Sequence, residues 1–454
     1  MARPNVLFLI SHDTGRMLQS YGYEVETPHL EALAHESVLF DEYYCAAPQC
    51  SPSRGSILTG LYPHNNGLIG LAHLGFCISP GVATLPAVFA SAGYETTLIG
   101  LSHETINVAP PIEDRVFSST YELGYERVIP VEGDRAPRVA DAAISYLAEQ
   151  RDAERPFYAS VGFFETHRDF DEYELVADDP AQVQVPPFLD DTPGVRHDLA
   201  QYNGSAKVLD RAVGRILEAL EAYGLKENTI VLYTTDHGVA FPNAKGTLKR
   251  AGLETALMIS APGHREGSRN NDLLCNIDLM PTLLELAGIE APEDIDGTSF
   301  AAAVTDGACC ARESFFTELT WHDAYHPMRG IRTKDYCYIM NLEDGPKVYV
   351  TVDAHLSASG RDMSPRLEVP NEPEELYDLT NDPQERVNLA DDPAYREVLE
   401  RLRGRVLAWM AETNDPVLAG PVAGTPSSRW AHEIAEGRAY PGRAAYYARI
   451  ARDY

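Results

Sequence analysis

Short apolar runs alternate with helix-like segments through about the first 290 residues. The apolar runs are typical of strands that are buried on both faces of a parallel sheet. They occupy residues 6–10, 96–100, 157–164 and 229–235. Between them, apolar residues recur every three or four positions, which predicts amphipathic helices over 28–36, 85–92, 138–149 and 199–223. This alternation predicts an α/β fold with a central, mostly parallel sheet.

The pattern changes near residue 313. Short strand-like runs follow at 315–319, 330–333, 336–340 and 375–379, and an amphipathic segment closes the series at 395–412. We therefore predict an α/β domain over residues 1–312, a smaller α+β domain over 313–416, and a tail over 417–454. The sequence leaves open whether the tail covers the surface, contacts a second subunit in a homo-oligomer, or is mobile.

The composition restricts the partners. The 454 residues hold 37 Lys and Arg against 68 Asp and Glu, a formal net charge of −31. Such a chain is repelled by nucleic acids and by anionic membranes, so we expect neither as a partner. An anionic substrate would need a local cluster of positive groups.

The cysteines and the N-terminus bear on the compartment. The seven cysteines show no disulfide spacing, which favours a reducing compartment. The apolar run at 6–10 is too short for the core of a signal peptide or for a membrane span. From these features we expect a cytoplasmic protein.

Residues 50–60, with the sequence CSPSRGSILTG, are the most informative segment. Pro52 predicts a helix that begins nearby, with Ser51 as its N-cap. Cys50 would then lie among free backbone amides at the positive end of the helix dipole. Arg54 adds a guanidinium suited to sulfate or phosphate. The alternative is a buried structural cysteine before an ordinary helix.

Four predicted strands end in acidic or imidazole residues. Ligands of open α/β sheets bind beyond the carboxyl ends of the strands, so these side chains should meet at one edge. A single residue of this kind is more often a cap or turn residue, but four strands in register weaken that interpretation. The residues are His12 and Asp13, His103, His167 and Arg168, and Asp236 and His237.

The motif Cys-x-Pro-Ser-Arg, followed by Leu-Thr-Gly, resembles the signature of the sulfatase family in the alkaline phosphatase superfamily. The resemblance spans nearly the whole chain and implies an alkaline-phosphatase-like α/β fold with a smaller C-terminal domain. It also implies that a maturation enzyme oxidises Cys50 to formylglycine, whose hydrate is the nucleophile. A thiolate would leave a stable thiosulfate ester, whereas a hydrate has a second hydroxyl that allows sulfate to leave.

The resemblance also implies a divalent metal, usually calcium, bound by Asp13, residue 50, Asp236 and His237. This chain departs from the family at His12, where aspartate is usual, and at His237, where asparagine is common. The two imidazoles bring Mn²⁺ or Zn²⁺ into consideration, although calcium remains our first expectation. His12 is either a ligand or a hydrogen-bond partner of one.

Further roles follow from matching positions. Lys245 and Arg54 would bind the sulfuryl oxygens, His103 would act as the base that releases sulfate, and His167 would protonate the leaving group. A second lysine of the family is missing two residues before His103. We hypothesise that His12 or Arg168 compensates for it.

Several strings resemble the sulfamidase branch, the N-sulfoglucosamine sulfohydrolases, most closely. They imply a sulfated amino sugar as the small anionic substrate. The alternatives are an O-sulfatase acting on a carbohydrate or aryl sulfate, a phosphonate or phosphodiester hydrolase, and a non-catalytic anion-binding protein. Further residues expected to line the substrate cleft are His73, Glu104, Arg168 and His322. The strings lie at 59–61, 64–67, 70–71, 167–168, 326–329, 375–389 and 409–416.

Overall fold

Alternate residues of strand β1 (Asn5–Ser11) pack into two separate cores, because successive side chains of a strand point to opposite faces of the sheet. Val6, Phe8 and Ile10 belong to one core. Leu7 and Leu9 belong to the other. The strand is therefore buried on both faces, as its continuous apolar run predicts.

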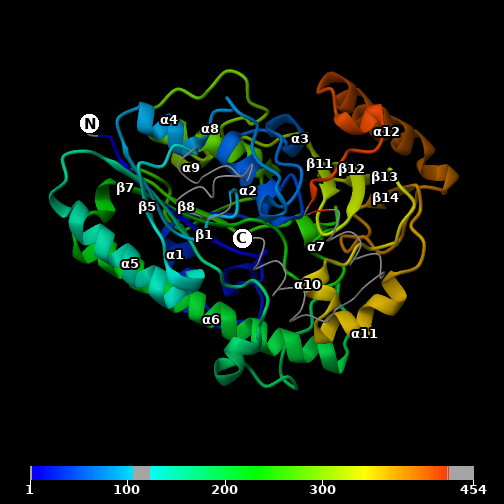
Figure 1. The fold of residues 1–454 in the computed structure, drawn as a ribbon, viewed down its shortest axis with the longest axis horizontal. Coiled ribbons are helices and arrows are strands. Elements are labelled where there is room, and N and C mark those ends of the chain that lie inside the picture. The colour runs from blue at the N-terminus through cyan, green and yellow to red at the C-terminus, as the bar shows by residue number, and fades with distance from the viewer. Residues whose placement is uncertain (1–2, 106–122, 427, 429–454) are drawn as a thin grey trace.

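The computed structural model describes residues 3–105, 123–426 and 428, and β1 lies within an eight-stranded sheet (Figure 1). All neighbouring strands of this sheet pair in parallel except at β8, which is antiparallel to both of its neighbours. The predicted mostly parallel sheet is thus confirmed. Across the sheet the order is β5 (Arg127–Ile129), β4 (Glu95–Gly100), β6 (Phe157–Gly162), β1, β7 (Thr229–Thr235), β8 (Leu257–Ser260), β2 (Val38–Phe40) and β9 (Ser268–Asn270).

Helices cover both faces of this sheet (Figure 1). The core that contains Leu7 is covered by α1 (Pro28–Glu36), α5 (Ala136–Glu149) and α6 (Pro193–Ala222). The core that contains Val6 is covered by α2 (Cys50–Thr59), α4 (Leu85–Ser91), α8 (Leu279–Leu286) and α9 (Ala301–Thr305). The result is the three-layer α/β arrangement expected from the sequence.

Helix α6 begins earlier than residue 199, where the apolar repeat led us to place its start. Its first residue is Pro193, and the Thr192 hydroxyl accepts a hydrogen bond from the Val195 amide at 3.2 Å. An N-cap threonine followed by proline is a common start for a helix. The apolar repeat locates only the part of the helix that faces the core.

A four-stranded antiparallel sheet follows in the order β11 (Ser314–Trp321), β12 (Tyr325–Thr333), β13 (Tyr336–Asn341) and β14 (Glu374–Asp378). Helix α12 (Arg396–Glu412) packs on it, and the Trp409 ring stacks on Phe316 with centroids 4.6 Å apart. The remaining elements are β3 (Tyr43–Tyr44), β10 (Leu274–Cys275), α3 (Pro63–Asn66), α7 (Arg250–Leu253), α10 (Val352–His355) and α11 (Ala358–Leu367), together with short 3₁₀ helices.

A buried polar junction joins the segment after α2 to the second sheet. His64 contacts Glu318 and Thr413, each at 2.8 Å. The guanidinium of Arg329 pairs with Asp415 through two nitrogens. Glu318 and Arg329 lie in β11 and β12, Thr413 and Asp415 follow α12, and His64 lies in the short helix after α2, so these contacts tie that helix to the second sheet.

Replacing Arg329 with alanine is expected to lower the free energy of unfolding by about 3–5 kcal/mol, since Asp415 would remain as a buried carboxylate without its cation. Urea denaturation followed by fluorescence measures this change. The matched control is Arg138→Ala, which removes an exposed pair with Glu132 and should cost about 0–1 kcal/mol. Equal losses in the two variants would contradict the assigned role of the junction.

The described part of the predicted tail lies against the second sheet. The Val422 carbonyl accepts a hydrogen bond from the Trp321 indole at 3.1 Å, and Thr425 contacts the Leu74 carbonyl. Residues 427 and 429–454, which make up most of that predicted tail, lie outside the described residues. No helix within residues 3–105, 123–426 and 428 is both long and apolar enough to cross a membrane.

Candidate active site

Helix α2 begins at Cys50, with Gln49 in the N-cap position. The prediction that Ser51 is the N-cap is wrong, because Ser51 lies within the helix. Its hydroxyl accepts a hydrogen bond from the Ala72 amide at 2.9 Å. Gly60 ends the helix with a φ of 68°, a conformation that glycine adopts without strain. Cys50 therefore occupies the first helical turn, as the oxyanion hypothesis requires.

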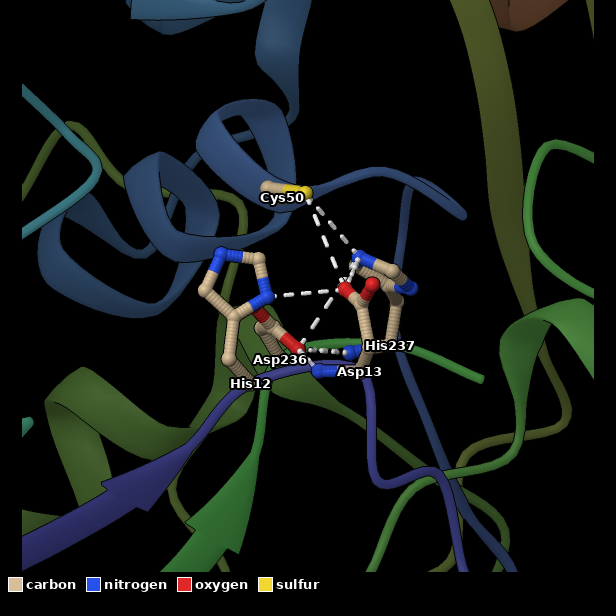
Figure 2. A group of neighbouring side chains, drawn as sticks. All are labelled: His12, Asp13, Cys50, Asp236 and His237. Carbon is tan, nitrogen blue, oxygen red and sulfur yellow. Dashed lines mark hydrogen bonds and ion pairs between the residues drawn. The ribbon is translucent and has the colours of Figure 1, made fainter. Parts of the chain in front are cut away.

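The ends of two neighbouring strands bring four side chains to Cys50 (Figure 2). His12 and Asp13 follow β1, and Asp236 and His237 follow β7. One possible ligand atom from each of these four residues and from Cys50 lies within 4.8 Å of the others. All five are buried. The four residues that follow β1 and β7 meet at one edge of the sheet, as expected for residues at the carboxyl ends of parallel strands.

Asp13 lies at the centre of this cluster. Its Oδ1 is 2.8 Å from His12 Nδ1, 2.9 Å from His237 Nε2 and 3.8 Å from the sulfur of Cys50. Its φ of 57° is uncommon for a residue other than glycine. The Asp236 carboxylate holds this turn, since its Oδ1 accepts hydrogen bonds from the amides of Asp13 and His237 at 2.9 and 3.0 Å.

Burial alone would lower the pKa of His12, but the Asp236 and Asp13 carboxylates outweigh burial and raise it to about 9. The pKa of Cys50 moves the other way: burial would raise it, yet Lys245, His12 and His237 hold it well below its ordinary value. The site therefore favours a negative charge at residue 50, as a nucleophile or metal ligand requires.

Arg54 is anchored beneath the cluster. Its Nε donates to Asp236 Oδ2 at 2.9 Å and its Nη2 donates to the Ser11 carbonyl at 3.3 Å. Its Nη1 lies 3.9 Å from Glu104 and has no hydrogen-bond partner among the described residues. Two nitrogens of the guanidinium that we expected to bind an oxyanion thus already donate within the protein. Nη1 is the nitrogen that remains as a donor for a bound anion.

Lys245 pairs with two carboxylates. Its Nζ is 2.8 Å from Asp13 Oδ2 and 3.1 Å from Asp353 Oδ2. Burial opposes protonation, but Asp13 and Asp353 outweigh it and raise the pKa of Lys245 well above its ordinary value. A buried, permanently charged ammonium therefore lies next to the cluster, at the place where the sequence predicted a sulfate-binding lysine.

Sequence reasoning missed Asp353. It comes from α10, more than 100 residues beyond Lys245, and its Oδ2 also lies 3.9 Å from His167 Nε2. Its Oδ1 is buried and has no hydrogen-bond partner among residues 3–105, 123–426 and 428. No motif marks it. The one local signal is an acidic residue in the first turn of a short helix, which usually only stabilises the helix.

Three imidazoles form a hydrogen-bonded chain that leads away from Asp13. His12 Nε2 lies 3.1 Å from His103 Nδ1, and His103 Nε2 lies 3.0 Å from His73 Nδ1. Burial lowers the pKa of His103 and lowers that of His73 to about 3. His103 is therefore neutral at pH 7 and able to accept a proton, which a base requires.

His167 also faces the cluster. Its Nε2 is 3.6 Å from Asp13 Oδ2, and its Nδ1 contacts the Arg168 carbonyl. Burial lowers the pKa of His167 to about 4. As the proton donor predicted from the sequence, it would first have to gain a proton, which a bound anion nearby favours.

His322 is oriented by Asp323, another residue that sequence reasoning missed. Its Nδ1 is 2.9 Å from the Asp323 carboxylate, which also accepts a hydrogen bond from the Val352 amide at 2.7 Å. Burial would lower the pKa of His322, but Asp323 outweighs burial and raises it to about 9. Its Nε2 is buried without a hydrogen-bond partner in the described part of the chain. His322 is thus a protonated donor at neutral pH.

Two predicted substrate residues have other contacts. Arg168 uses Nε, Nη1 and Nη2 to contact the Ala240 carbonyl, Asp198 and Ser359 at 2.7, 2.9 and 3.1 Å. These contacts connect segments of the fold, which disfavours the hypothesis that Arg168 replaces the missing lysine. Glu104 accepts hydrogen bonds from Ser102 and from the His103 amide, so it holds the turn that carries His103.

The cluster fits a divalent cation. His237 donates from Nδ1 to the Gly238 carbonyl at 2.8 Å, and its Nε2 faces Asp13 and Cys50. Burial would lower the pKa of His237, but Asp236 and Asp13 outweigh burial and raise it, so a metal would bind Nε2 in place of a proton. Orientation of an imidazole by a carbonyl is typical of metal-binding histidines. Gly238 is required here, since a Cβ would lie 1.9 Å from the Ala251 carbonyl oxygen.

Comparisons with known proteins bear on this arrangement. Residues 4–289 match the family described as Sulfatase, and residues 244–355 match the family described as N-sulphoglucosamine sulphohydrolase, C-terminal. The chain is 30% identical to N-sulphoglucosamine sulphohydrolase from Homo sapiens over 476 aligned residues, which cover 92% of each protein.

Two other matches show the breadth of the similarity. The N-acetylglucosamine-6-O-sulfatase of Bacteroides thetaiotaomicron is 26% identical over 75% of this chain and 79% of that protein. The solved structure of the putative sulfatase yidJ from Bacteroides fragilis gives a TM-score of 0.73 at 24% identity, covering 93% of this chain and 98% of the other. At that identity the structural match supports the fold alone.

Proposed function

Because this chain belongs to the sulfatase family, we propose that it hydrolyses the N–S bond of a sulfated amino sugar and releases inorganic sulfate. The single observation that carries the proposal is the buried cluster around Cys50, in which carboxylates, imidazoles and two cations converge on one side chain. Similarity to the human N-sulphoglucosamine sulphohydrolase over most of both chains favours the sulfamate among sulfated substrates.

Residue 50 is proposed to act as formylglycine, formed from Cys50 by a maturation enzyme. The modified residue supplies an aldehyde hydrate, whose oxygen is a nucleophile toward sulfur and whose second hydroxyl allows sulfate to be released. The position of Cys50 at the first turn of α2 supports this role, because the helix N-terminus favours negative charge there.

A divalent metal is proposed to be held by Asp13, residue 50, Asp236, His237 and His12. When bound, such an ion supplies a Lewis acid that withdraws charge from a sulfuryl oxygen. The chain's own cations act beside it. Lys245 and the unpartnered Nη1 of Arg54 would bind the other sulfuryl oxygens and stabilise their charge as the S–N bond breaks.

The departing amine must take a proton as the S–N bond breaks, since an amide ion is a poor leaving group. His167 is the predicted donor, and His322, which Asp323 keeps protonated, is a second group suited to this transfer. His103 is proposed to accept the proton whose loss frees sulfate. Water then restores the hydrate, so the net reaction consumes one water and yields an amine and sulfate.

The test compares three substrates at matched concentrations with protein that carries the matured residue 50. We expect glucosamine N-sulfate to give a higher kcat/KM than 4-nitrophenyl sulfate and a phenyl phosphonate monoester. A higher value for an O-sulfate would favour the second candidate, which the 6-O-sulfatase relative supports. Hydrolysis of the phosphonate alone would contradict sulfatase activity. No turnover by matured protein would favour an anion-binding role.

A further inference from the structure

We infer that the metal site selects a transition-metal dication, Mn²⁺ or Zn²⁺, over Ca²⁺ through the imidazoles of His12 and His237. The inference rests on the proposed metal site but not on the identity of the substrate. It replaces our sequence-based expectation of calcium.

The orientation of His237 is fixed from outside the cluster. A backbone carbonyl only accepts hydrogen bonds, so the contact between Nδ1 and the Gly238 oxygen places the ring proton on Nδ1. The Nε2 atom then points at the centre of the cluster, 2.9 Å from Asp13 Oδ1 and 3.4 Å from the sulfur of Cys50, and a metal would bind it in place of a proton. An asparagine here would offer an oxygen instead.

His12 is oriented in the same way. Its Nε2 contacts His103 Nδ1 at 3.1 Å, and a proton on His12 Nε2 satisfies that contact. Its Nδ1 lies 2.8 Å from Asp13 Oδ1 and 3.4 Å from Asp236 Oδ2, and is the nitrogen that a metal would bind in place of a proton. The ring is only 2% exposed, so this nitrogen has no access to bulk water. Two buried nitrogens therefore face one point.

The cluster offers oxygens from only two carboxylates, Asp13 and Asp236, together with residue 50, whereas calcium takes six to eight oxygen ligands. Asp236 Oδ1 accepts two backbone N–H groups, and Asp236 Oδ2 accepts the Nε of Arg54. Asp13 Oδ2 accepts the ammonium of Lys245. Asp13 Oδ1 differs from these oxygens, because the side chains it contacts are themselves candidate ligands: His12, His237 and Cys50.

The resulting donor set is carboxylate oxygens of Asp13 and Asp236, two imidazole nitrogens and the atom presented by residue 50. Nitrogen ligands suit Mn²⁺ and Zn²⁺, whereas Ca²⁺ is a hard ion that binds oxygen. In the tetrahedral geometry that Zn²⁺ adopts, neighbouring ligands lie about 3.3 Å apart. The observed contacts of 2.8, 2.9, 3.4 and 3.8 Å bracket that value.

The test uses metal-free full-length protein that retains the Cys50 thiol, so the readout does not depend on turnover. The protein is dialysed to equilibrium against equal concentrations of Mn²⁺, Zn²⁺ and Ca²⁺, and the bound metals are measured by inductively coupled plasma mass spectrometry. Titration with Co²⁺, followed by its visible absorption, reports independently whether nitrogen ligands surround the ion. The His12→Asp/His237→Asn variant restores oxygen donors, and His35→Asn, at an exposed position on α1, is the matched control.

We expect Mn²⁺ or Zn²⁺ to occupy the wild-type and control sites at least ~10-fold more than Ca²⁺, and this preference to fall or reverse in the double variant. A smaller preference in the wild type, or an unchanged preference in a folded double variant, would overturn the inference. If the double variant fails to fold, the Co²⁺ spectrum of the wild type decides, because a six-coordinate, all-oxygen spectrum would overturn it. Failure of the substrate assay leaves these binding results intact.

Discussion

Replacing Cys50 with alanine is expected to lower kcat/KM for sulfate release by at least about 10⁴-fold, since the variant has no atom at residue 50 that can attack sulfur. The fold should persist, because the side chain removed is small and lies at the first turn of a helix rather than in a large apolar core. Inorganic sulfate is measured by ion chromatography, and circular dichroism verifies folding.

Cys45→Ala is the matched control. Cys45 is also buried, but its thiol contacts the Gly252 carbonyl in a core that contains no part of the cluster. This variant should lose stability while its kcat/KM stays within a factor of about two of the wild type. A Cys50→Ala enzyme with more than a tenth of wild-type activity would contradict covalent catalysis at this residue.

Replacing Lys245 with alanine is expected to lower kcat/KM by about 10³-fold, the effect typical of losing one charged group that stabilises the transition state. Lys245 is the buried ammonium nearest the cluster, so no solvent cation can replace it. Most of the loss should appear in kcat if the interaction strengthens as the S–N bond breaks.

Loss of Lys245 also leaves the Asp13 and Asp353 carboxylates unpaired, which by itself disturbs the site. The Lys245→Ala/Asp353→Asn variant separates the two effects by removing one negative charge together with the positive one. If activity returned to the wild-type value in this double variant, Lys245 would serve only to neutralise Asp353. Lys226→Ala, at a more exposed pair with Glu36, is the control and should retain full activity.

The central sheet could be predicted because its strands are apolar on both faces, and residues such as Val6 and Leu7 belong to opposite cores. The edge strands could not. Strand β9 (Ser268–Asn270) has three residues, none of them apolar, and it forms only by pairing with β2. Tertiary pairing, rather than local pattern, decides such strands.

The site residues that directly follow strands of the central sheet could be predicted from the sequence. Those contributed by the region after residue 313 were harder to predict. His12, Asp13, Asp236 and His237 meet because parallel strands end at one edge. Asp353, beside Lys245, and Asp323, which orients the expected cleft residue His322, come from the region after residue 313, and no motif or spacing in the sequence marks either aspartate. Arg168 pairs with Asp198, because a strand-end position does not determine where a long side chain points.

The strings that resemble the sulfamidase branch explain why the substrate is hard to infer. His64, Arg329 and Asp415, which belong to three of these strings, form the junction between α3 and the second sheet. The contacts of these residues hold the fold together and report little about the sugar. The substrate assay therefore carries more weight than further sequence comparison.

The most direct test is peptide mass spectrometry across residue 50 in protein purified from its native host in a form that releases sulfate. We predict that residue 50 is an aldehyde that reacts with a hydrazide probe, and that sulfate release scales with the aldehyde fraction. A preparation that turns over at full rate while residue 50 is a thiol, alkylated by iodoacetamide, would contradict the account.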